Sequence, residues 1–383
     1  MEFTMFEISG KFATAKIYAE PHFIEETAST QIKALCDSEY TEGSNIAIMP
    51  DCHAGKGCVI GFTQTLPNKM VIPSLVGCDI GCGMLAMHLQ GVDFSDEKNL
   101  RRLDMACHRD VKSGFDIWDK PHAFAAYVED ELKEMIAPID FDKAMRSIGS
   151  LGSGNHFIEL NKSNDGTYWL VIHTGSRHLG LEVEGYYTKQ AEASEGSQFA
   201  AVKGQAFEDY IHDMRIAQKF ASINRQAISS QISDAFKFNA TQFVEGEKGI
   251  VETIHNYIDL ENMIVRKGAI RLSDGEMAII PMNMADGSLI VRGKGNVDWN
   301  QSGPHGAGRL MSRGQARRTL TMEDFKDSMK GIYSTTVCQD TIDESKMAYK
   351  PMKSIVEAIK DTCEIVEIVK PVYNFKAAEK RRK

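Results

Sequence analysis

The chain has 383 residues, of which 43% are hydrophobic, so it can bury the core of one elaborate domain or of two closely joined ones. A formal net charge of −9 argues against a protein that coats nucleic acid non-specifically, but it leaves room for a local basic groove. We expect a soluble cytoplasmic protein, because the first residues carry no secretion signal and no window reaches the roughly 18 uncharged apolar residues of a membrane span. The eight cysteines have irregular spacings that fit a reducing compartment, so most should be free thiols.

Residues 45–50 are an apolar run closed by a proline and predict a buried strand. The loop that follows, residues 51–57, places Asp51, Cys52 and His53 together at the end of this strand. A carboxylate, a thiol and an imidazole in one loop are typical of a site, although an Asp close to a His is also an ordinary turn. Taken alone, the grouping is weak support for a functional role.

The glycine-punctuated loop 76–83 follows a second apolar run, residues 70–75, which repeats the pattern of strand and loop. It contains Asp79 and Cys82, a hard carboxylate and a soft thiolate, and its glycines allow the tight turn that brings both to one point. We therefore interpret it as a metal loop whose remaining ligands come from elsewhere in the chain. His88, in the apolar segment that follows, is expected to be a packed strand residue.

A helical region is predicted from residue 93 to residue 137, with Ser95 or Asp96 as its cap. The glycine-rich loop 146–156 then runs directly into an alternating strand and ends at His156. Its glycines permit the close backbone approach that a phosphate requires, but it lacks the Lys-Ser/Thr of a P-loop and the spacing of a dinucleotide fingerprint. The loop is therefore a candidate phosphate contact without a specific motif.

The strand predicted at residues 168–172 places His173 at its end, so His156 and His173 are expected on a shared rim. Residues 186–236 predict a long amphipathic helix, with His212 outside its apolar face and exposed to solvent. That face consists of Phe207, Tyr210, Ile211, Met214, Ala217 and Ala221.

His255 lies in a polar stretch that offers a further ligand, and a strand followed by a polar turn is predicted over residues 278–288. After a Gly-Pro pair, His305 is followed by Arg309 and Arg313, which are four residues apart and share a face if a helix begins there. An exposed imidazole beside two guanidinium groups is suited to attack on a phosphate. A simple turn explains this stretch equally well when it is considered alone.

A local basic groove is suggested by the segment 292–318, whose basic residues are opposed in the sequence only by Asp298. These basic residues are Arg292, Lys294, Arg309, Arg313, Arg317 and Arg318. Lys267 is a further candidate phosphate contact. The basic tail, residues 380–383, is expected to be a solvated chain end rather than an arm for nucleic acid.

Several stretches, taken together and in order, carry a resemblance to a known family. They are Met49-Pro-Asp51-Cys-His53, Gly77-Cys-Asp79-Ile-Gly-Cys82-Gly, Gly154-Asn155-His156-Phe-Ile-Glu159, His173-Thr-Gly-Ser-Arg, His255-Asn-Tyr, Arg266-Lys267-Gly-Ala and His305-Gly-Ala-Gly-Arg309-Leu-Met-Ser-Arg313. In this order they resemble the RtcB family of RNA ligases, and they cover nearly the whole chain from about residue 49. The loop with Asp79 and Cys82 and the motif that begins at His305 are the most specific parts.

The resemblance implies an α/β (α+β) fold, a single RtcB-like domain over residues 1–383, with metals at the base of a deep central cleft. It also implies a ligase that depends on GTP and on two Mn²⁺ ions. Such a ligase joins RNA ends with a 2′,3′-cyclic phosphate or 3′-phosphate to 5′-hydroxyl ends, in RNA repair or tRNA splicing. RNA and GTP are therefore the implied partners, and an archease-like activator is a further candidate partner.

Carried over position by position, the resemblance implies that His305 takes GMP as a phosphoramidate and that Cys82 bridges the two ions. The implied metal ligands are Asp79, Cys82, His156, His173 and His255. The implied nucleotide contacts are Asn155, Glu159, Asn283, Ser288, Ala307, Gly308 and Lys376, with Glu159 and Lys376 at the guanine. Family members usually have Pro-Gly-Ser-Met-Gly where this chain has residues 281–285, so Asn283 replaces a serine.

Two other functions stay open at this point. A metal-dependent phosphohydrolase acting on nucleotides would use the same ligands and would turn over phosphate esters without a covalent guanylate. The loop around His305 disfavours it, because hydrolysis needs no such nucleophile. A non-catalytic metal- and RNA-binding protein would bind RNA tightly with no nucleotide chemistry.

Overall fold

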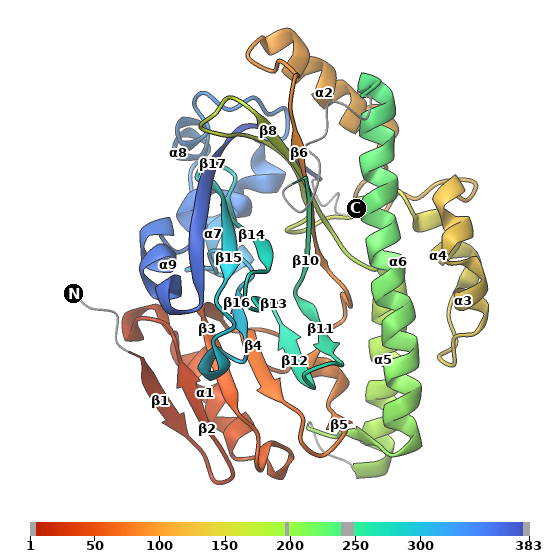
Figure 1. Ribbon diagram of the computed structural model, residues 1–383, viewed down its shortest axis with the longest axis vertical. Helices are drawn as coiled ribbons and strands as arrows, with labels where there is room; N and C mark the ends of the chain where they lie inside the picture. Colours follow the sequence, from red (N-terminus) through yellow and green to blue (C-terminus); the bar gives the residue numbers. More distant parts are fainter. Residues whose placement is uncertain (1–4, 196–198, 239–248, 378–383) are drawn as a thin grey trace.

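Two large β-sheets lie at the centre of the molecule, with the helices on their outer sides (Figure 1). This computed structural model describes residues 5–195, 199–238 and 249–377. One sheet has six strands in the order β1-β2-β3-β4-β12-β11, and the other has seven in the order β10-β6-β8-β7-β17-β15-β14. The predicted mixed α/β fold class is therefore confirmed.

The six-stranded sheet is antiparallel except for the parallel pair β2 and β3. Its strands are β1 (Phe6–Ser9), β2 (Thr14–Ile17), β3 (Ile46–His53), β4 (Ile60–Thr65), β11 (Asn256–Asp259) and β12 (Ile264–Lys267). The prediction that the strand ends at Pro50 is wrong, because β3 continues to His53. Proline is tolerated there since the register between β3 and β4 shifts between Ile48 and His53, so the regular ladder is interrupted.

The seven-stranded sheet is antiparallel throughout, and its edge strands β10 and β14 contact each other, so the sheet curls almost into a closed barrel. Its strands are β6 (Gly83–Leu89), β7 (Phe157–Lys162), β8 (Tyr168–Thr174), β10 (Ile250–Ile254), β14 (Met277–Asn283), β15 (Gly287–Gly293) and β17 (Cys363–Lys376). Two small sheets pair β13 (Ala269–Arg271) with β16 (Ser302–Pro304) and β5 (Met70–Val71) with β9 (Val202–Lys203). The apolar run 70–75 therefore supplies only a two-residue strand.

Side chains alternate across the curled sheet, as the two-residue period of a strand requires. Met84 and Ala86 belong to an inner cluster with residues of β7, β8, β10, β14, β15 and β17. Leu85 and Met87 point the opposite way and pack in a cluster with Leu103 and residues of the long helix behind the sheet. The same alternation carries His88 to a half-buried position where its ring stacks on Trp169, as expected for a packed strand residue.

The helices begin at side-chain caps where the sequence supplies them. Their bounds are α1 (Glu26–Cys36), α2 (Glu97–Asp110), α3 (Glu129–Lys133), α4 (Phe141–Ser147), α5 (Arg177–Glu195), α6 (Gln205–Phe236), α7 (Arg313–Thr319), α8 (Met322–Ser328) and α9 (Met352–Ala358). Asp96 caps α2 by accepting a hydrogen bond from the Lys98 amide, so the second of the two predicted caps is the right one. Asp140 and Ser312 cap α4 and α7 in the same way.

Two helix predictions need correction. The region from 93 to 137 holds one long helix, α2, which stops at Asp110; the rest is loop, a 3₁₀ turn and the short α3. The predicted helix 186–236 is two helices, α5 and α6, with β9 between them. All six residues of the predicted apolar face are buried, and His212 is 42% exposed at its side chain, as predicted.

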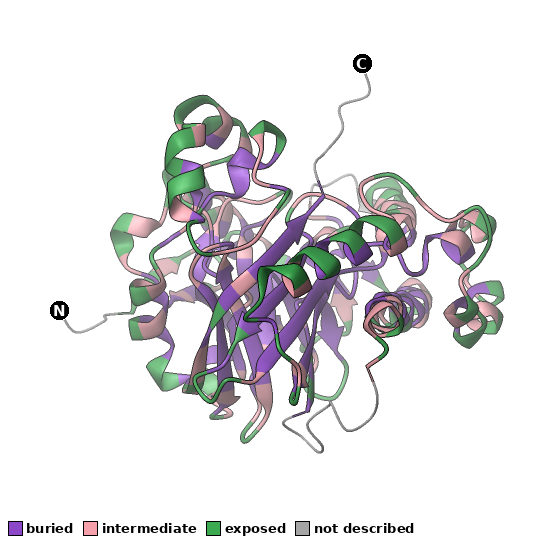
Figure 2. Ribbon diagram, turned by 90° about the horizontal axis from the view of Figure 1, so that it is seen from above, coloured by how far each residue is buried: buried purple, intermediate pink, exposed green. Residues whose placement is uncertain are grey.

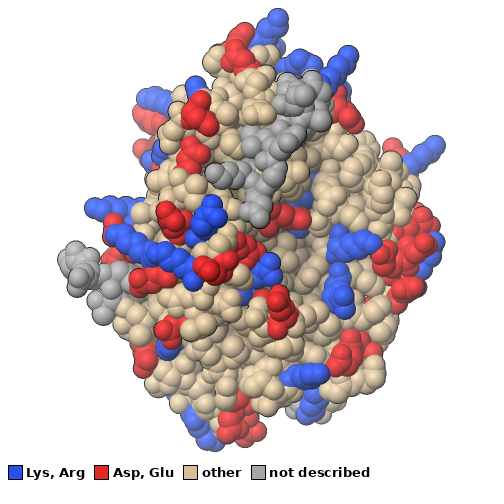
Figure 3. Space-filling model, in the orientation of Figure 1, with Lys and Arg blue, Asp and Glu red and all other residues tan. Residues whose placement is uncertain are grey.

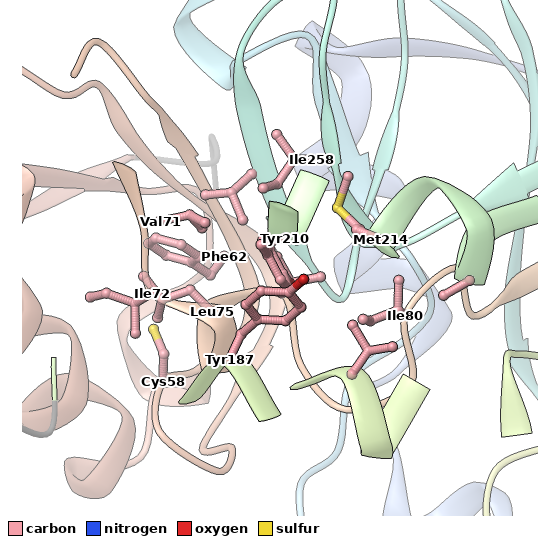
Figure 4. Packing of buried hydrophobic residues seen from close by; sticks show 14 of the residues in the cluster. Cys58, Phe62, Val71, Ile72, Leu75, Ile80, Tyr187, Tyr210, Met214 and Ile258 are labelled. Carbon is pink, nitrogen blue, oxygen red and sulfur yellow. The ribbon is translucent and has the colours of Figure 1, made fainter. Parts of the chain in front are cut away.

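The largest hydrophobic cluster lies between the six-stranded sheet and helices α5 and α6. Figure 4 shows Tyr210 and Met214 of α6 and Tyr187 of α5 among Phe62, Leu75 and other residues of the sheet side. Figure 2 shows the buried strands enclosed by helices whose outer faces are exposed. This packing fixes α5 and α6 against the six-stranded sheet.

The surface and the cysteines agree with the composition. On the face seen in Figure 3, basic and acidic side chains are interspersed, with no large area of one sign. All eight cysteines are free thiols, as predicted. Among the described residues, none of the helices combines the length and the apolar character required to traverse a bilayer. The basic tail 380–383 lies outside the described residues.

Candidate active site and metal centre

One end of the curled sheet gathers the predicted site residues. Because neighbouring strands are antiparallel, the start of β6 or β7 lies at the same end as the finish of β8, β10, β14 or β17. Cys82 precedes β6, His156 precedes β7, and His173 is the next to last residue of β8. His255 follows β10 and Lys376 ends β17. Residues far apart in the sequence therefore meet at one rim.

Three of the predicted metal ligands form a buried cluster. The Sγ atom of Cys82 lies 3.3 Å from Nε2 of His173 and 3.5 Å from Nε2 of His156. The potential ligand atoms of these three residues all lie within 4.8 Å of one another. A thiolate and two imidazoles at this separation are a typical ligand set for a divalent transition metal.

The backbone fixes the orientation of both imidazoles. Nδ1 of His156 lies 2.8 Å from the carbonyl oxygen of Leu151, and Nδ1 of His173 lies 3.3 Å from that of Asn155. If each Nδ1 donates its proton to the carbonyl, each Nε2 carries a lone pair directed at Cys82. Burial also lowers the pKa of His173, so its ring is neutral. The cluster thus fits a metal ion by its geometry, and the neutral ring of His173 is ready to act as a ligand.

Asp79 lies at the rim of this cluster. Its Oδ2 is 3.0 Å from Nε2 of His156, and its Oδ1 accepts a hydrogen bond from the Ser176 amide. Burial opposes ionisation, but the interactions with His156 outweigh it and lower the pKa of Asp79 to about 2. A Cβ at Gly175 would lie 2.1 Å from Oδ1 of Asp79, so only glycine leaves room for this carboxylate.

His255 links the cluster to the predicted nucleophile. Its ring centroid is 5.2 Å from that of His173 and 4.8 Å from that of His305. Burial lowers the pKa of His255, so the ring is neutral and can act as a ligand. The pKa of Cys82 shifts upward instead, because burial, followed by the negative charge of Asp79, disfavours the thiolate. A bound cation would therefore be needed to keep this thiol ionised.

Arg225 of α6 hydrogen-bonds the backbone next to two of the predicted metal ligands. Its side chain is fully buried, and Nη1 donates hydrogen bonds to the carbonyls of Gly81 and Thr174, at 2.9 and 2.7 Å. These carbonyls adjoin Cys82 and His173. Nothing local in the sequence identifies these two acceptors, because they lie in segments far from α6 along the chain.

A cavity of about 260 Å³ opens beside the cluster. Its size is close to the lower end of small-ligand pockets, roughly 300 Å³, and is too small for a folded RNA. The site residues that line it are Asn155, Glu159, His173, Asn283, His305, Ala307, Gly308 and Lys376. His53, Arg309, Arg313, Glu344 and Asn374 also line it.

Asp51 holds the imidazole of His305. Nδ1 of His305 lies 2.6 Å from Oδ2 of Asp51, whose side chain is fully buried, and the His305 amide donates to the same oxygen. Nδ1 therefore carries the proton and Nε2 keeps a free lone pair. The backbone carbonyl of Asp51 accepts from Nδ1 of His53 at 2.9 Å. The Asp-Cys-His grouping, weak in the sequence, thus orients two imidazoles of the cavity.

Glu159 lies at the far wall of the cavity. Its oxygens accept hydrogen bonds from the amide groups of Asn161 and Asn374, at 2.9 and 2.6 Å. Burial raises the pKa of Glu159 to about 7, since these bonds offset only part of the cost of an ionised carboxylate. Asn374 was missed in the sequence, because its role depends on the pairing of β17 with β7.

Three arginines of the predicted basic segment, Arg309, Arg313 and Arg317, pair with acidic residues that lie outside that segment. Arg313 and Arg309 each direct Nη1 at Oε1 of Glu344, and Lys376 donates to Oε2 at 2.5 Å. Burial opposes ionisation of Glu344, but these three cations outweigh it and lower its pKa to about 2. Arg313 also bonds Asp343. A helix does not begin at Arg309, so the condition for Arg309 and Arg313 to share a helix face is not met: α7 begins at Arg313, and the two meet through Glu344 instead.

Of three further predicted contact residues, two do not line the cavity, and the third, Asn283, lines it but uses its side chain in a turn. Asn283 uses its side chain in a turn: Oδ1 accepts from the amides of residues 285 and 286, and Nδ2 donates to Asp286. Ser288 is fully buried and does not line the cavity. Lys267 donates to the carbonyls of Lys56 and Ser74 and is likewise absent from the cavity wall.

Fold and site together define a class: a mixed α/β protein with a buried Cys/His metal-ligand cluster beside a carboxylate-held imidazole. Comparison with known sequences identifies the family. The family model described as "tRNA-splicing ligase RtcB" matches residues 38–139 and 136–377. The chain belongs to the RtcB family, as the sequence motifs predicted.

Relatives in this family come from bacteria and archaea. The chain is 30% identical to "RNA-splicing ligase RtcB" of Escherichia coli (strain K12), in an alignment that covers 86% of this chain and 89% of the relative. It is 26% identical to "tRNA-splicing ligase RtcB" of Aeropyrum pernix, in an alignment that covers 90% of each. Family membership and these names support an RNA ligase as the class of enzyme.

Proposed function

We propose that the protein is a GTP- and Mn²⁺-dependent RNA ligase that joins RNA 2′,3′-cyclic phosphate or 3′-phosphate ends to 5′-hydroxyl ends. The observation that carries the proposal is the 2.6 Å contact between Asp51 and Nδ1 of His305 in a ligand-sized cavity beside the Cys/His cluster. It supplies a nucleophile, a means of activating it and a neighbouring cation site. The whole described chain would serve this one function as a single domain.

In the first step, Nε2 of His305 attacks the α-phosphorus of GTP. A P–N bond forms, the P–O bond to pyrophosphate breaks, and pyrophosphate leaves with the electron pair. The Nδ1 proton stays on the ring, and the carboxylate of Asp51 stabilises the positive charge that develops there. Because Asp51 is held in a strand, it imposes the orientation before substrate arrives.

The other wall of the cavity would take the nucleoside. Glu159 can accept hydrogen bonds from the N–H groups of guanine, and Lys376 can donate to its carbonyl oxygen. Asn155, Asn283, Ala307 and Gly308 would contact the rest of the GMP, with Asn283 contributing its backbone because its side chain is used in the turn. Ser288 would support this loop from behind.

Divalent ions held by Asp79, Cys82, His156, His173 and His255 would neutralise phosphate charge. Imidazole and thiolate donors accept Mn²⁺, although by intrinsic affinity they prefer Zn²⁺. Arg309 and Arg313 line the same cavity and would bind the phosphates of the leaving group or of the RNA end. Glu344 keeps these arginines and Lys376 in place between cycles.

The remaining steps transfer the guanylate to RNA. The RNA 3′-phosphate oxygen attacks the phosphorus on His305, which breaks the P–N bond and gives an RNA end activated as RNA-ppG. The 5′-hydroxyl of the second RNA then attacks the RNA phosphate, a phosphodiester forms, and GMP leaves. A cyclic end would first be opened by water to a 3′-monophosphate.

The test is to incubate the protein with Mn²⁺ and GTP labelled at the α-phosphate and to measure acid-labile, alkali-stable label on the chain. We expect label on the wild type and on His22→Ala, an exposed histidine outside the cavity. His305→Ala should take up none. Label retained in His305→Ala would refute the nucleophile.

The same experiment separates the competing functions. Turnover of GTP or phosphate esters without covalent label, by folded and metal-loaded protein, would favour the phosphohydrolase. Tight RNA binding without nucleotide chemistry would favour a binding protein. Adding RNA with defined ends after labelling then shows which ends receive the guanylate.

A further inference from the structure

Lys350 is a buried cation placed directly behind Asp51. It is 1% exposed, and its Nζ donates hydrogen bonds to the carbonyls of Pro50 and Cys52, at 2.9 and 2.7 Å. These are the two carbonyls on either side of Asp51 in β3. A buried lysine costs free energy unless its donors are satisfied, so the ammonium group and this strand end stabilise each other.

Asp51 needs such support. Its side chain is fully buried, and while Oδ2 bonds His305, Oδ1 has no hydrogen-bond partner among the described residues. The titratable groups that face Lys350 are Asp51, Cys52, His53 and Glu25, so the ammonium supplies positive charge beside the buried carboxylate. An ionised carboxylate in this position therefore depends on Lys350 as well as on the imidazole.

The backbone of Lys350 also contacts the loop that carries His305. Its amide donates to the carbonyl of Gly308 at 2.9 Å, and the Leu310 amide donates to the carbonyl of Ala348 at 2.8 Å. Gly308 in turn packs so closely on Asp51 that a Cβ would lie 2.1 Å from the Asp51 carbonyl oxygen. Lys350 thus ties the loop that carries His305 to the strand that carries Asp51.

We propose that Lys350 is a positioning residue that holds the carboxylate of Asp51 against His305 and thereby sets the rate of histidine guanylylation. It lies outside the cavity wall and touches no substrate. The inference rests on the proposed function in one respect, because the rate to be measured is that of guanylylation of His305. Lys350 acts only through Asp51, so its effect should be confined to steps that use His305.

The variant Lys350→Met should slow guanylylation by about 10- to 100-fold, as loss of an orienting partner does elsewhere. Sealing of a chemically prepared RNA-ppG end with a 5′-hydroxyl RNA does not use His305 and should keep its wild-type rate. Lys33→Met, which removes an exposed lysine of α1 that pairs with Asp37 outside the cavity, is the control and should change neither rate. If both steps fall together in Lys350→Met, its role is structural and the proposal is wrong.

A double-mutant cycle tests whether Lys350 affects guanylylation through Asp51. In an Asp51→Asn background, Lys350→Met should cause little further loss of guanylylation, because the contact that it maintains is already gone. Fully multiplicative losses would overturn the proposal. Should Lys350→Met fail to fold, Lys350→Gln keeps one donor for a carbonyl without the charge and enters the same cycle.

A second measurement does not depend on guanylylation. The proton between Nδ1 of His305 and Asp51 should give a strongly downfield resonance in the ¹H NMR spectrum, assigned by its loss in His305→Ala. We expect this signal to shift or vanish in Lys350→Met and to persist in Lys33→Met. An unchanged signal in Lys350→Met would refute the positioning role, whereas absence of label on the wild type would refute only the proposed function.

Discussion

At the scale of single residues, Asp51 holds Nδ1 of His305, and in the proposed mechanism this contact leaves Nε2 as the nitrogen that reacts. Asparagine at this position keeps the shape but can present its amide N–H to Nδ1, which would place the imidazole proton on Nε2. We expect Asp51→Asn to lower the rate of His305 labelling by about 10³- to 10⁴-fold. Bound metal, measured by elemental analysis, should be unchanged, and a rate within a few fold of the wild type would contradict this role of Asp51.

Glu159 makes the stability depend on pH. Burial raises its pKa from 4.5 in the unfolded chain to about 7 in the folded protein, so the folded state holds this proton more tightly. The associated stability, about 3 kcal/mol, is fully present below pH 4.5 and is lost as the pH rises through 7. Glu159→Gln cannot titrate. Urea unfolding at pH 5 and pH 8 should therefore show a larger loss for the wild type than for this variant; equal losses would contradict the assignment.

Single residues also show how far the sequence could predict the site. Cys82, His156 and His173 meet as the motifs indicated, because each lies beside a strand end that the hydrophobic pattern locates. The support that Asp51, Asn374 and Glu344 provide could not be predicted, since each reaches its partner through strand pairing or a loop contact between distant segments. A local pattern identifies donors and acceptors, but not which of them meet.

At the scale of elements, α6 packs in the hydrophobic core and, through Arg225, also contacts the segments that carry Cys82 and His173. Replacing it by methionine would leave the buried carbonyls of Gly81 and Thr174 without a donor, which costs roughly 2–4 kcal/mol of folding free energy. We expect Arg225→Met to unfold at lower urea concentration and to bind less metal. Gln226→Ala, at the next and exposed position, is the control. Full metal content in Arg225→Met would argue against the supporting role.

Elements were predicted best where one local signal dominates. The apolar face of α6 and the cap of α2 are local features, and the structure confirms both. The end of β3 was misplaced because proline breaks a regular ladder but not an irregular one. The break between α5 and α6 was missed because helical periodicity on both sides masked it. The sequence left open whether a helix begins near Arg309; α7 begins only at Arg313, and the contact of Arg309 with Glu344 joins distant segments.

At the scale of the whole molecule, metal binding should stabilise the fold. The ligands come from several strand ends, so an ion bound only by the folded state adds about 2.7 kcal/mol at 100 times its dissociation constant. We expect the melting temperature to rise as Mn²⁺ or Zn²⁺ is added to chelator-treated protein, and to fall again with chelator. Cys82→Ser should weaken the response, and an identical titration would count against the Cys/His cluster.

The position of β17 has a consequence for synthesis of the protein. It is the last strand of the described chain, yet it lies in the middle of the curled sheet and joins β7 to β15. As the chain leaves the ribosome, Cys82, His156 and His173 emerge long before Asn374 and Lys376. The two parts of the sheet, β10-β6-β8-β7 and β15-β14, are therefore joined only once β17 has been synthesised. A product truncated before β17 would contain Cys82, His156 and His173 but not the complete cavity wall. The cavity wall to which Asn374 and Lys376 belong is therefore complete only after β17 has emerged.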